Sequence, residues 1–183
     1  MSRIQAVNPA EATGKAKELL NAVQAKIGMT PNLMKTLAQA PAALEGYLNF
    51  SGALSGGVLS AKFREEVALA VAQANSCEYC LSAHSAIGKM VGLKPEEIAA
   101  SRQSHSADAK QNAGLQFAQA IVVLKGEVST AAIEAVRAAG YSEAEITEIV
   151  ANVALNIFTN YFNHVAQTEV DFPHVSVALA QGA

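Results

Sequence analysis

The sequence predicts an all-α protein, and three observations support that prediction. Helix-start signals, in which a capping residue is followed by proline or by a glutamate three residues later, recur from Asn8 to Ser142. Glycines follow several of the apolar runs that these signals open, as is typical of helix C-termini. No stretch shows a sustained alternation of β-branched and polar residues, the pattern expected of half-buried strands.

Residues 1–57 are predicted to contain only helices. The first should begin near Asn8, whose following proline and glutamate complete a start signal, and should end at Gly28. Two further helices should begin near Pro31 and at Pro41.

Residues 58–92 are predicted to form two helices that carry the distinctive side chains of the chain. Ser60 should cap the first helix, Asn75 and Ser76 should break it, and the second should end at Gly92. Later helices are expected to start at 94 and to cover 108–125, 129–140 and 142–168, followed by an arm or loose tail at 169–183.

The length of 183 residues fits one domain, spanning 1–183, with a substantial core. Within it, residues 59–84 align without a gap with residues 141–166, and Tyr79 and Tyr161 coincide. Segment 141–168 is therefore either an internal repeat of the preceding helical pair or an unrelated buried helix of similar pattern.

Composition excludes several classes of function. A net charge of −3 gives no basic field for nucleic acid. No apolar run approaches the length of a membrane span, and the N-terminal residues lack the apolar core of a signal peptide. We therefore expect neither a nucleic-acid nor a membrane partner, and a cytoplasmic location, where a Cys-x-x-Cys pair is more often catalytic or metal-binding than structural.

The two cysteines of the chain form a Cys-x-x-Cys pair that is followed one helical turn later by a histidine: Cys77, Cys80 and His84. At roughly 100° per residue, the three side chains fall within an arc of about 60° on a helix. If Ser76 is the N-cap, both cysteines lie in the first turn, where the macrodipole favours a thiolate. This arrangement suits thiol–disulfide chemistry, with one sulfur attacking, one resolving and a base moving the proton.

Two other interpretations of these residues are open. They fit small buried side chains of a packed helix, with no chemical role. Cys77, Cys80 and His84 also supply three ligands for a metal, although a structural zinc ion needs a fourth, from Glu65 or from another subunit.

Two adjacent glutamates precede the cysteines. Glu65 belongs to the helix that should pack against the cysteine helix, so its carboxylate is a candidate partner of His84. Glu66 is expected to be an ordinary solvated residue.

Polar residues also interrupt the apolar pattern of the last long helix. Asn156, Thr159, Asn160 and Asn163 predict either a buried hydrogen-bonded network or a contact between subunits. The network is favoured, because unpaired buried amides are costly.

Together these residues resemble a known family. The run 59–69, the segment Asn75-Ser76-Cys77-Glu78-Tyr79-Cys80 and then His84 are similar to the alkyl hydroperoxidase D (AhpD)-like proteins of the carboxymuconolactone decarboxylase superfamily. The family motif Glu-x₁₁-Cys-x-x-Cys-x₃-His is matched at every spacing. Asn156 to Asn163 resemble its peroxidase-related branch more loosely.

The resemblance implies an AhpD-like helical fold, usually oligomeric, and a role for each motif residue. Cys80 would be the peroxidatic cysteine and Cys77 the resolving one. His84 and Glu65 would form the proton relay, with Cys77 or a water between them and Cys80. The best-known members carry a histidine immediately before the second cysteine, where this chain has Tyr79, so we expect a slower relay.

The predicted function is a thiol-dependent peroxidase that reduces hydroperoxides and is reduced by an external dithiol, in the prototype a lipoyl-bearing protein. No cofactor and no resident metal are implied. The alternatives are a general thiol–disulfide oxidoreductase and a non-enzymatic, redox-responsive or metal-clipped helical oligomer. A hydrophobic fraction of 51% with only 16% charged residues also predicts a homo-oligomer.

Overall fold

The computed structural model describes residues 2–178 of the chain. Within this range the regular structure consists of nine α-helices and no strand, which confirms the all-α prediction. The helices are α1 (Gly14–Ile27), α2 (Asn32–Leu37), α3 (Pro41–Ser55), α4 (Ala61–Ala74), α5 (Glu78–Met90), α6 (Pro95–Arg102), α7 (Ala109–Val123), α8 (Thr130–Ala138) and α9 (Glu143–Ala166).

Most helix ends lie where local signals place them, but the start of the first helix does not. Gly28 ends α1 in the left-handed conformation, with φ of 77°, and Ser142 caps α9 together with Glu145. The prediction that α1 begins at Asn8 is wrong. The side chain of Asn8 instead accepts a hydrogen bond from the N–H of Ala10, which closes a local turn before the helix.

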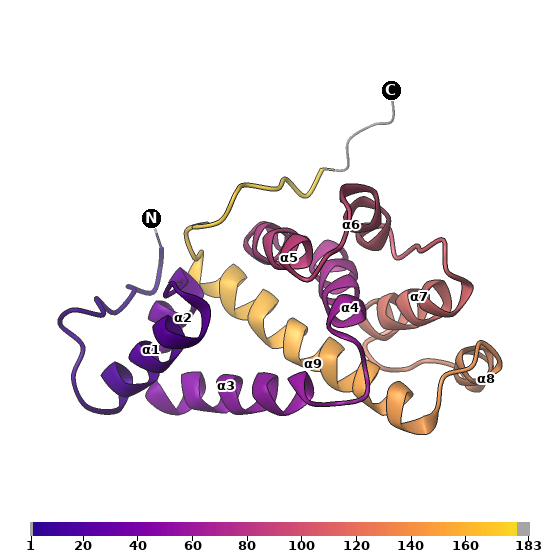
Figure 1. The fold of residues 1–183 in the computed structure, drawn as a ribbon, viewed down its shortest axis with the longest axis horizontal. Coiled ribbons are helices and arrows are strands. Elements are labelled where there is room, and N and C mark those ends of the chain that lie inside the picture. The colour runs from indigo at the N-terminus through magenta and orange to yellow at the C-terminus, as the bar shows by residue number, and fades with distance from the viewer. Residues whose placement is uncertain (1, 179–183) are drawn as a thin grey trace.

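Helix α4 lies at the centre of the core, and α9 crosses the molecule beside it (Figure 1). Every residue from 66 to 72 of α4 is buried. Leu69 and Ala72 pack into an apolar cluster with α5 and the N-terminal helices, whereas Val67 and Val71 pack into a second cluster with α7, α8 and α9. A helix that is buried on all sides holds its polar side chains in fixed positions, and this makes α4 a rigid support for the site.

The segment 169–178, which follows α9, is an extended arm that passes over α5 toward α6 (Figure 1). The N–H of Val175 donates to the Ser82 hydroxyl of α5 at 2.9 Å, and the Gln73 side chain of α4 donates to the Val177 carbonyl at 2.9 Å. The arm is therefore fixed on α5 over residues 169–178. Positions 179–183 of the expected tail lie outside the described residues.

The two segments with similar sequences differ in one respect. Residues 59–84 form two helices, α4 and α5, separated by a break, whereas residues 141–166 contain the single helix α9. An internal repeat and a chance similarity of the two segments therefore both stay predictions.

None of the helices between residues 2 and 178 combines the length and the apolar character needed to span a membrane.

Candidate active site

The junction between α4 and α5 places the two cysteines. Asn75 ends α4, and Ser76 takes the left-handed conformation, with φ of 55°. The expectation that Ser76 is the N-cap of the next helix is wrong, because Cys77 itself has the extended backbone of a cap. The Sγ of Cys77 accepts a hydrogen bond from the N–H of Cys80 at 3.4 Å. Cys80 therefore occupies the first turn of α5.

Both cysteines are free thiols and nearly inaccessible, each with 2% of its surface exposed. The pKa of the Cys80 thiol is lowered, first because the Cys77 thiol donates a hydrogen bond to it, and then by the positive charge of His84 and by side-chain amides. Burial opposes this shift. The pKa of Cys77 is raised by the same hydrogen bond and by burial. Cys80 is therefore the sulfur that ionises first.

His84 and Glu65 meet across the α4–α5 contact. The Nδ1 of His84 lies 2.8 Å from Oε2 of Glu65, and about one fifth of each side chain is exposed, 21% and 17%. Burial lowers the pKa of His84, but the charge of Glu65 and its hydrogen bond raise it by more, so the net shift is upward. The pair can hold a proton beside Cys80 near neutral pH.

Helix α9 completes the surroundings of the sulfur from the other half of the chain. The Nδ2 of Asn163 donates to the Sγ of Cys80 at 3.3 Å. The Oδ1 of Asn160 accepts from the Asn75 side chain at 2.9 Å. Cys80 is thus surrounded by groups from α4, α5 and α9.

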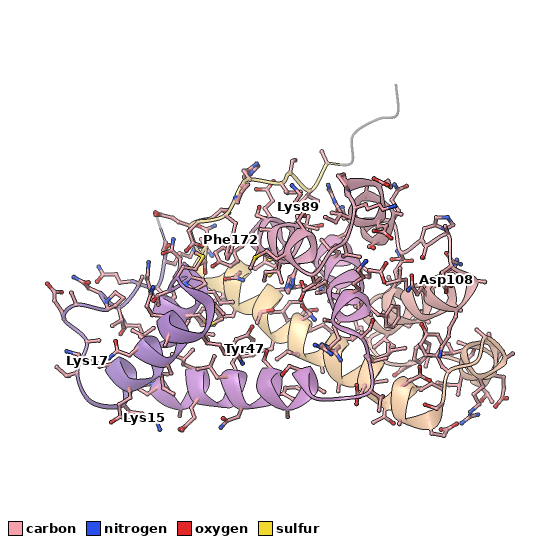
Figure 2. The ribbon with its side chains drawn as sticks, viewed as in Figure 1. Lys15, Lys17, Tyr47, Lys89, Asp108 and Phe172 are labelled. Atoms are coloured by element: carbon pink, nitrogen blue, oxygen red, sulfur yellow. The ribbon has the colours of Figure 1, made fainter. Side chains whose placement is uncertain are left out.

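A cavity of about 350 Å³ opens beside this cluster. Cys80, His84 and Glu65 line it, whereas Cys77 does not. Figure 2 shows that Tyr47 faces α9 from α3 and that Phe172 lies on the arm. The apolar part of the wall includes Leu33, Met34, Leu54, Ile87, Leu155 and Phe172. The cavity offers an organic molecule a largely apolar surface with the Cys80 thiol in its wall.

Comparisons with known proteins find relatives of this chain in one family and one fold. Residues 41–121 match the model of the carboxymuconolactone decarboxylase family. A solved structure described as the alkylhydroperoxidase AhpD core, an uncharacterized peroxidase-related protein from Ralstonia eutropha JMP134, is 27% identical with a TM-score of 0.83. The match covers 93% of this chain and 92% of that one. These matches confirm the predicted resemblance to the AhpD-like proteins of the carboxymuconolactone decarboxylase superfamily.

Two further structures share the fold at lower identity. A peroxidase-related protein from Silicibacter sp. TM1040 is 24% identical with a TM-score of 0.78, over 98% of this chain and 96% of that one. A Cys→Ala variant of the debrominase Bmp8, in complex with 2,3,4-tribromopyrrole, is 16% identical with a TM-score of 0.79, over 93% and 92%. No curated protein matches the chain.

Tyr79 stands where the best-known AhpD-like proteins have a histidine, and its hydroxyl is occupied by other contacts. It donates to Oδ1 of Asp171 on the arm at 2.9 Å and accepts from the N–H of Leu33 at 3.0 Å. Its ring also meets that of Phe172 edge-on, with centroids 5.9 Å apart. Tyr79 therefore joins α5, the start of α2 and the arm.

The structure brings together all four residues predicted for the site, Glu65, Cys77, Cys80 and His84, although their catalytic roles stay predictions. The expectation that Glu66 is solvated is wrong: only 3% of it is exposed, because this part of α4 is buried on every side. Burial, reinforced by the charge of Glu97, raises the pKa of Glu66 to about 7. No three His, Cys, Asp or Glu side chains within residues 2–178 gather closely enough to hold a metal ion.

Sequence reasoning missed the contact between Asn163 and Cys80. The signal was present, because Asn163 was one of the polar residues interrupting the apolar face of α9. It predicted a buried network but not its partner, which lies 83 residues away along the chain.

Proposed function

We propose that this AhpD-like protein is a thiol-dependent peroxidase that reduces hydroperoxides through Cys80 and Cys77. The observation that supports this most directly is the asymmetry of the pair. Cys80 has the lowered pKa and faces the cavity, whereas Cys77 has the raised pKa and does not line the cavity. An attacking sulfur needs both ionisation and access, and a resolving sulfur needs only proximity.

The reaction begins at the cavity wall. The Cys80 thiolate attacks the terminal oxygen of the hydroperoxide, the O–O bond breaks, and the sulfur becomes a sulfenic acid. The alkoxide that leaves takes a proton from the imidazolium of His84, which Glu65 stabilises at 2.8 Å, and departs as an alcohol.

Cys77 then resolves the sulfenic acid. Its sulfur attacks the Cys80 sulfur, a disulfide forms, and the sulfenic oxygen leaves as water with the thiol proton. An external dithiol returns both cysteines to thiols and is itself oxidised to a disulfide. The family resemblance favours a lipoyl-bearing protein as that dithiol.

Two other reactions of the same thiols would appear as outcomes of the test. One is thiol–disulfide exchange without peroxide. The other is reductive debromination, in which two thiols become a disulfide while a carbon–bromine bond is replaced by carbon–hydrogen and bromide is released. Two observations favour testing debromination as well: the largely apolar cavity beside Cys80 and the fold shared with the debrominase Bmp8.

The deciding experiment is steady-state turnover with a panel of hydroperoxides and dithiols, and with a bromopyrrole as a further substrate. We expect hydroperoxide-dependent consumption of the dithiol, and a loss of both free thiols when one equivalent of peroxide is added without dithiol. If the thiols are oxidised but nothing turns over with any dithiol, the protein is a redox-responsive switch. Metal analysis of the purified protein tests the metal-clipped alternative.

We also propose that the protein is a homo-oligomer assembled through α9. Val150, Phe158, Tyr161 and Val165 are 42% to 62% exposed and fall within an arc of about 80° on the helix. An apolar stripe of this length on the surface is typical of a protein interface. A second copy of the chain would cover it.

Val165→Asp should therefore shift the mass measured by light scattering at micromolar concentration toward that of the monomer, because a carboxylate would be buried in the interface. Val123→Asp is the matched control, since Val123 is 64% exposed but lies on α7. A monomeric wild-type protein, or dissociation by both variants, would contradict the proposal.

A further inference from the structure

Two buried asparagines of α9 have polar atoms that the proposed mechanism leaves unused. Asn160 is fully buried and Asn163 is 4% exposed. The Nδ2 of Asn160 and the Oδ1 of Asn163 make no hydrogen bond with the described part of the chain. Buried amide atoms without a hydrogen-bond partner destabilise the fold. Two of them beside the Cys80 sulfur therefore suggest a role in the chemistry of that sulfur.

Other polar residues of the same helix behave differently. Asn152 and Asn156 donate their side-chain N–H groups to backbone carbonyls one turn earlier in α9, and both line the cavity. Asn160 and Asn163 make no such bonds and do not line the cavity. Asn160 and Asn163 therefore approach Cys80 from the buried core of the protein and not from the cavity.

The orientation of both amides is set by their neighbours. Asn75, at the end of α4, donates to the Oδ1 of Asn160, which leaves the Nδ2 of Asn160 as the free end of that amide. Asn163 directs its Nδ2 at the Cys80 sulfur at 3.3 Å. The two residues are three apart on one helix and so lie on the same face.

We propose that Asn160 and Asn163 form a pair of amide donors that holds Cys80 as a thiolate, with Asn163 donating directly to the sulfur and Asn160 supplying a second N–H when the thiol ionises. The inference rests on the proposed function only in taking Cys80 as the attacking sulfur. Hydrogen bonds to an ionised group are the stronger kind, so donors fixed in the core favour the thiolate over the thiol. Both side-chain amides are among the groups that lower the pKa of Cys80.

The amide pair differs from the other groups around the sulfur in having no charge to lose. The titratable groups that face Cys80 are Cys77, Tyr79 and His84 of α5, Glu65 of α4 and Tyr47 of α3. The stabilisation by His84 disappears when its imidazolium deprotonates, whereas neutral amides donate at every pH. The pair should therefore sustain the thiolate above the pKa of His84.

The test is the pH dependence of Cys80 alkylation by iodoacetamide in a Cys77→Ser background, which leaves one thiol. Asn163→Leu should raise the midpoint of the profile by about one pH unit, because a donor to the charged form is lost. Asn163→Asp keeps the size and shape of the side chain. It should raise the midpoint of the alkylation profile at least as much, because its carboxylate repels the thiolate. Asn160→Leu should raise it by a smaller amount.

Ser85→Ala is the matched control, because Ser85 is also buried, on α5, with a hydroxyl that makes no hydrogen bond, and it is not among the groups that shift the pKa of Cys80. It should leave the midpoint unchanged. Circular dichroism and melting temperatures identify the folded variants, and Asn163→Asp serves if Asn163→Leu does not fold.

An unchanged midpoint in folded Asn163 variants would overturn the inference even if the wild-type protein reduces peroxides. A raised midpoint in a protein without peroxide turnover would support the amide pair and overturn the proposed function. The two results are independent.

Discussion

Cys80→Ser is expected to reduce peroxide turnover to the uncatalysed background. Cys80 is the cysteine that lines the cavity and has the lowered pKa, whereas a serine hydroxyl in the same place stays protonated at neutral pH. Cys77 would remain, but its raised pKa and its position away from the cavity leave it unable to replace Cys80. Steady-state consumption of dithiol with an organic hydroperoxide measures the loss.

Cys77→Ser is the paired variant, and it should behave differently. Cys80 should still react once with peroxide, after which the sulfenic acid persists because no second sulfur is available. Mass spectrometry after trapping with a sulfenic-acid reagent should find the adduct on Cys80. A trapped adduct on Cys77 in the Cys80→Ser variant would mean that the roles of the two cysteines are reversed.

The sequence predicted the parts of the site that depend on short-range geometry. Cys80 and His84 are four positions apart in α5, so helical periodicity alone places them on one face, and Cys77 precedes them as the cap of that helix. The break at Asn75 and Ser76 was also predicted from local signals. Glu65 required one further step, the packing of α4 against α5, which was expected for two consecutive helices, and the family motif assigned Glu65 to the same site.

The rest depends on packing between distant segments. Asn163 reaches Cys80 from 83 residues away, and Asp171 binds the Tyr79 hydroxyl from the arm. Such contacts follow from how helices pack, and no local periodicity specifies them. Glu66 was misjudged for a similar reason, because this part of α4 is covered not only by the adjacent α5 but also by α6, α7 and α9, which lie farther along the chain.

Glu65→Gln should raise the pH midpoint of Cys80 alkylation by about one unit, which slows the reaction about tenfold at pH values well below that midpoint. Glu65 raises the pKa of His84 against the effect of burial, so the amide variant should have a His84 that is neutral at pH 7. The thiolate of Cys80 would then lose the positive charge that helps to lower its pKa. The deficit should shrink as pH rises past the midpoint of the variant, because Cys80 is then a thiolate in both proteins. The rate of alkylation between pH 5 and 10 measures this.

Glu66→Gln is the control for this prediction, since it makes the same substitution at the next residue of α4. Glu66 is buried and has a raised pKa, but Glu97, Lys62 and Asp108 are the charges that act on it, and it does not line the cavity. Its variant should therefore retain the wild-type alkylation profile. An unshifted profile for Glu65→Gln would show that the carboxylate does not hold the proton on His84. Equal shifts in both variants would point instead to a general loosening of α4, because only a specific pairing with His84 distinguishes two adjacent glutamates of one helix.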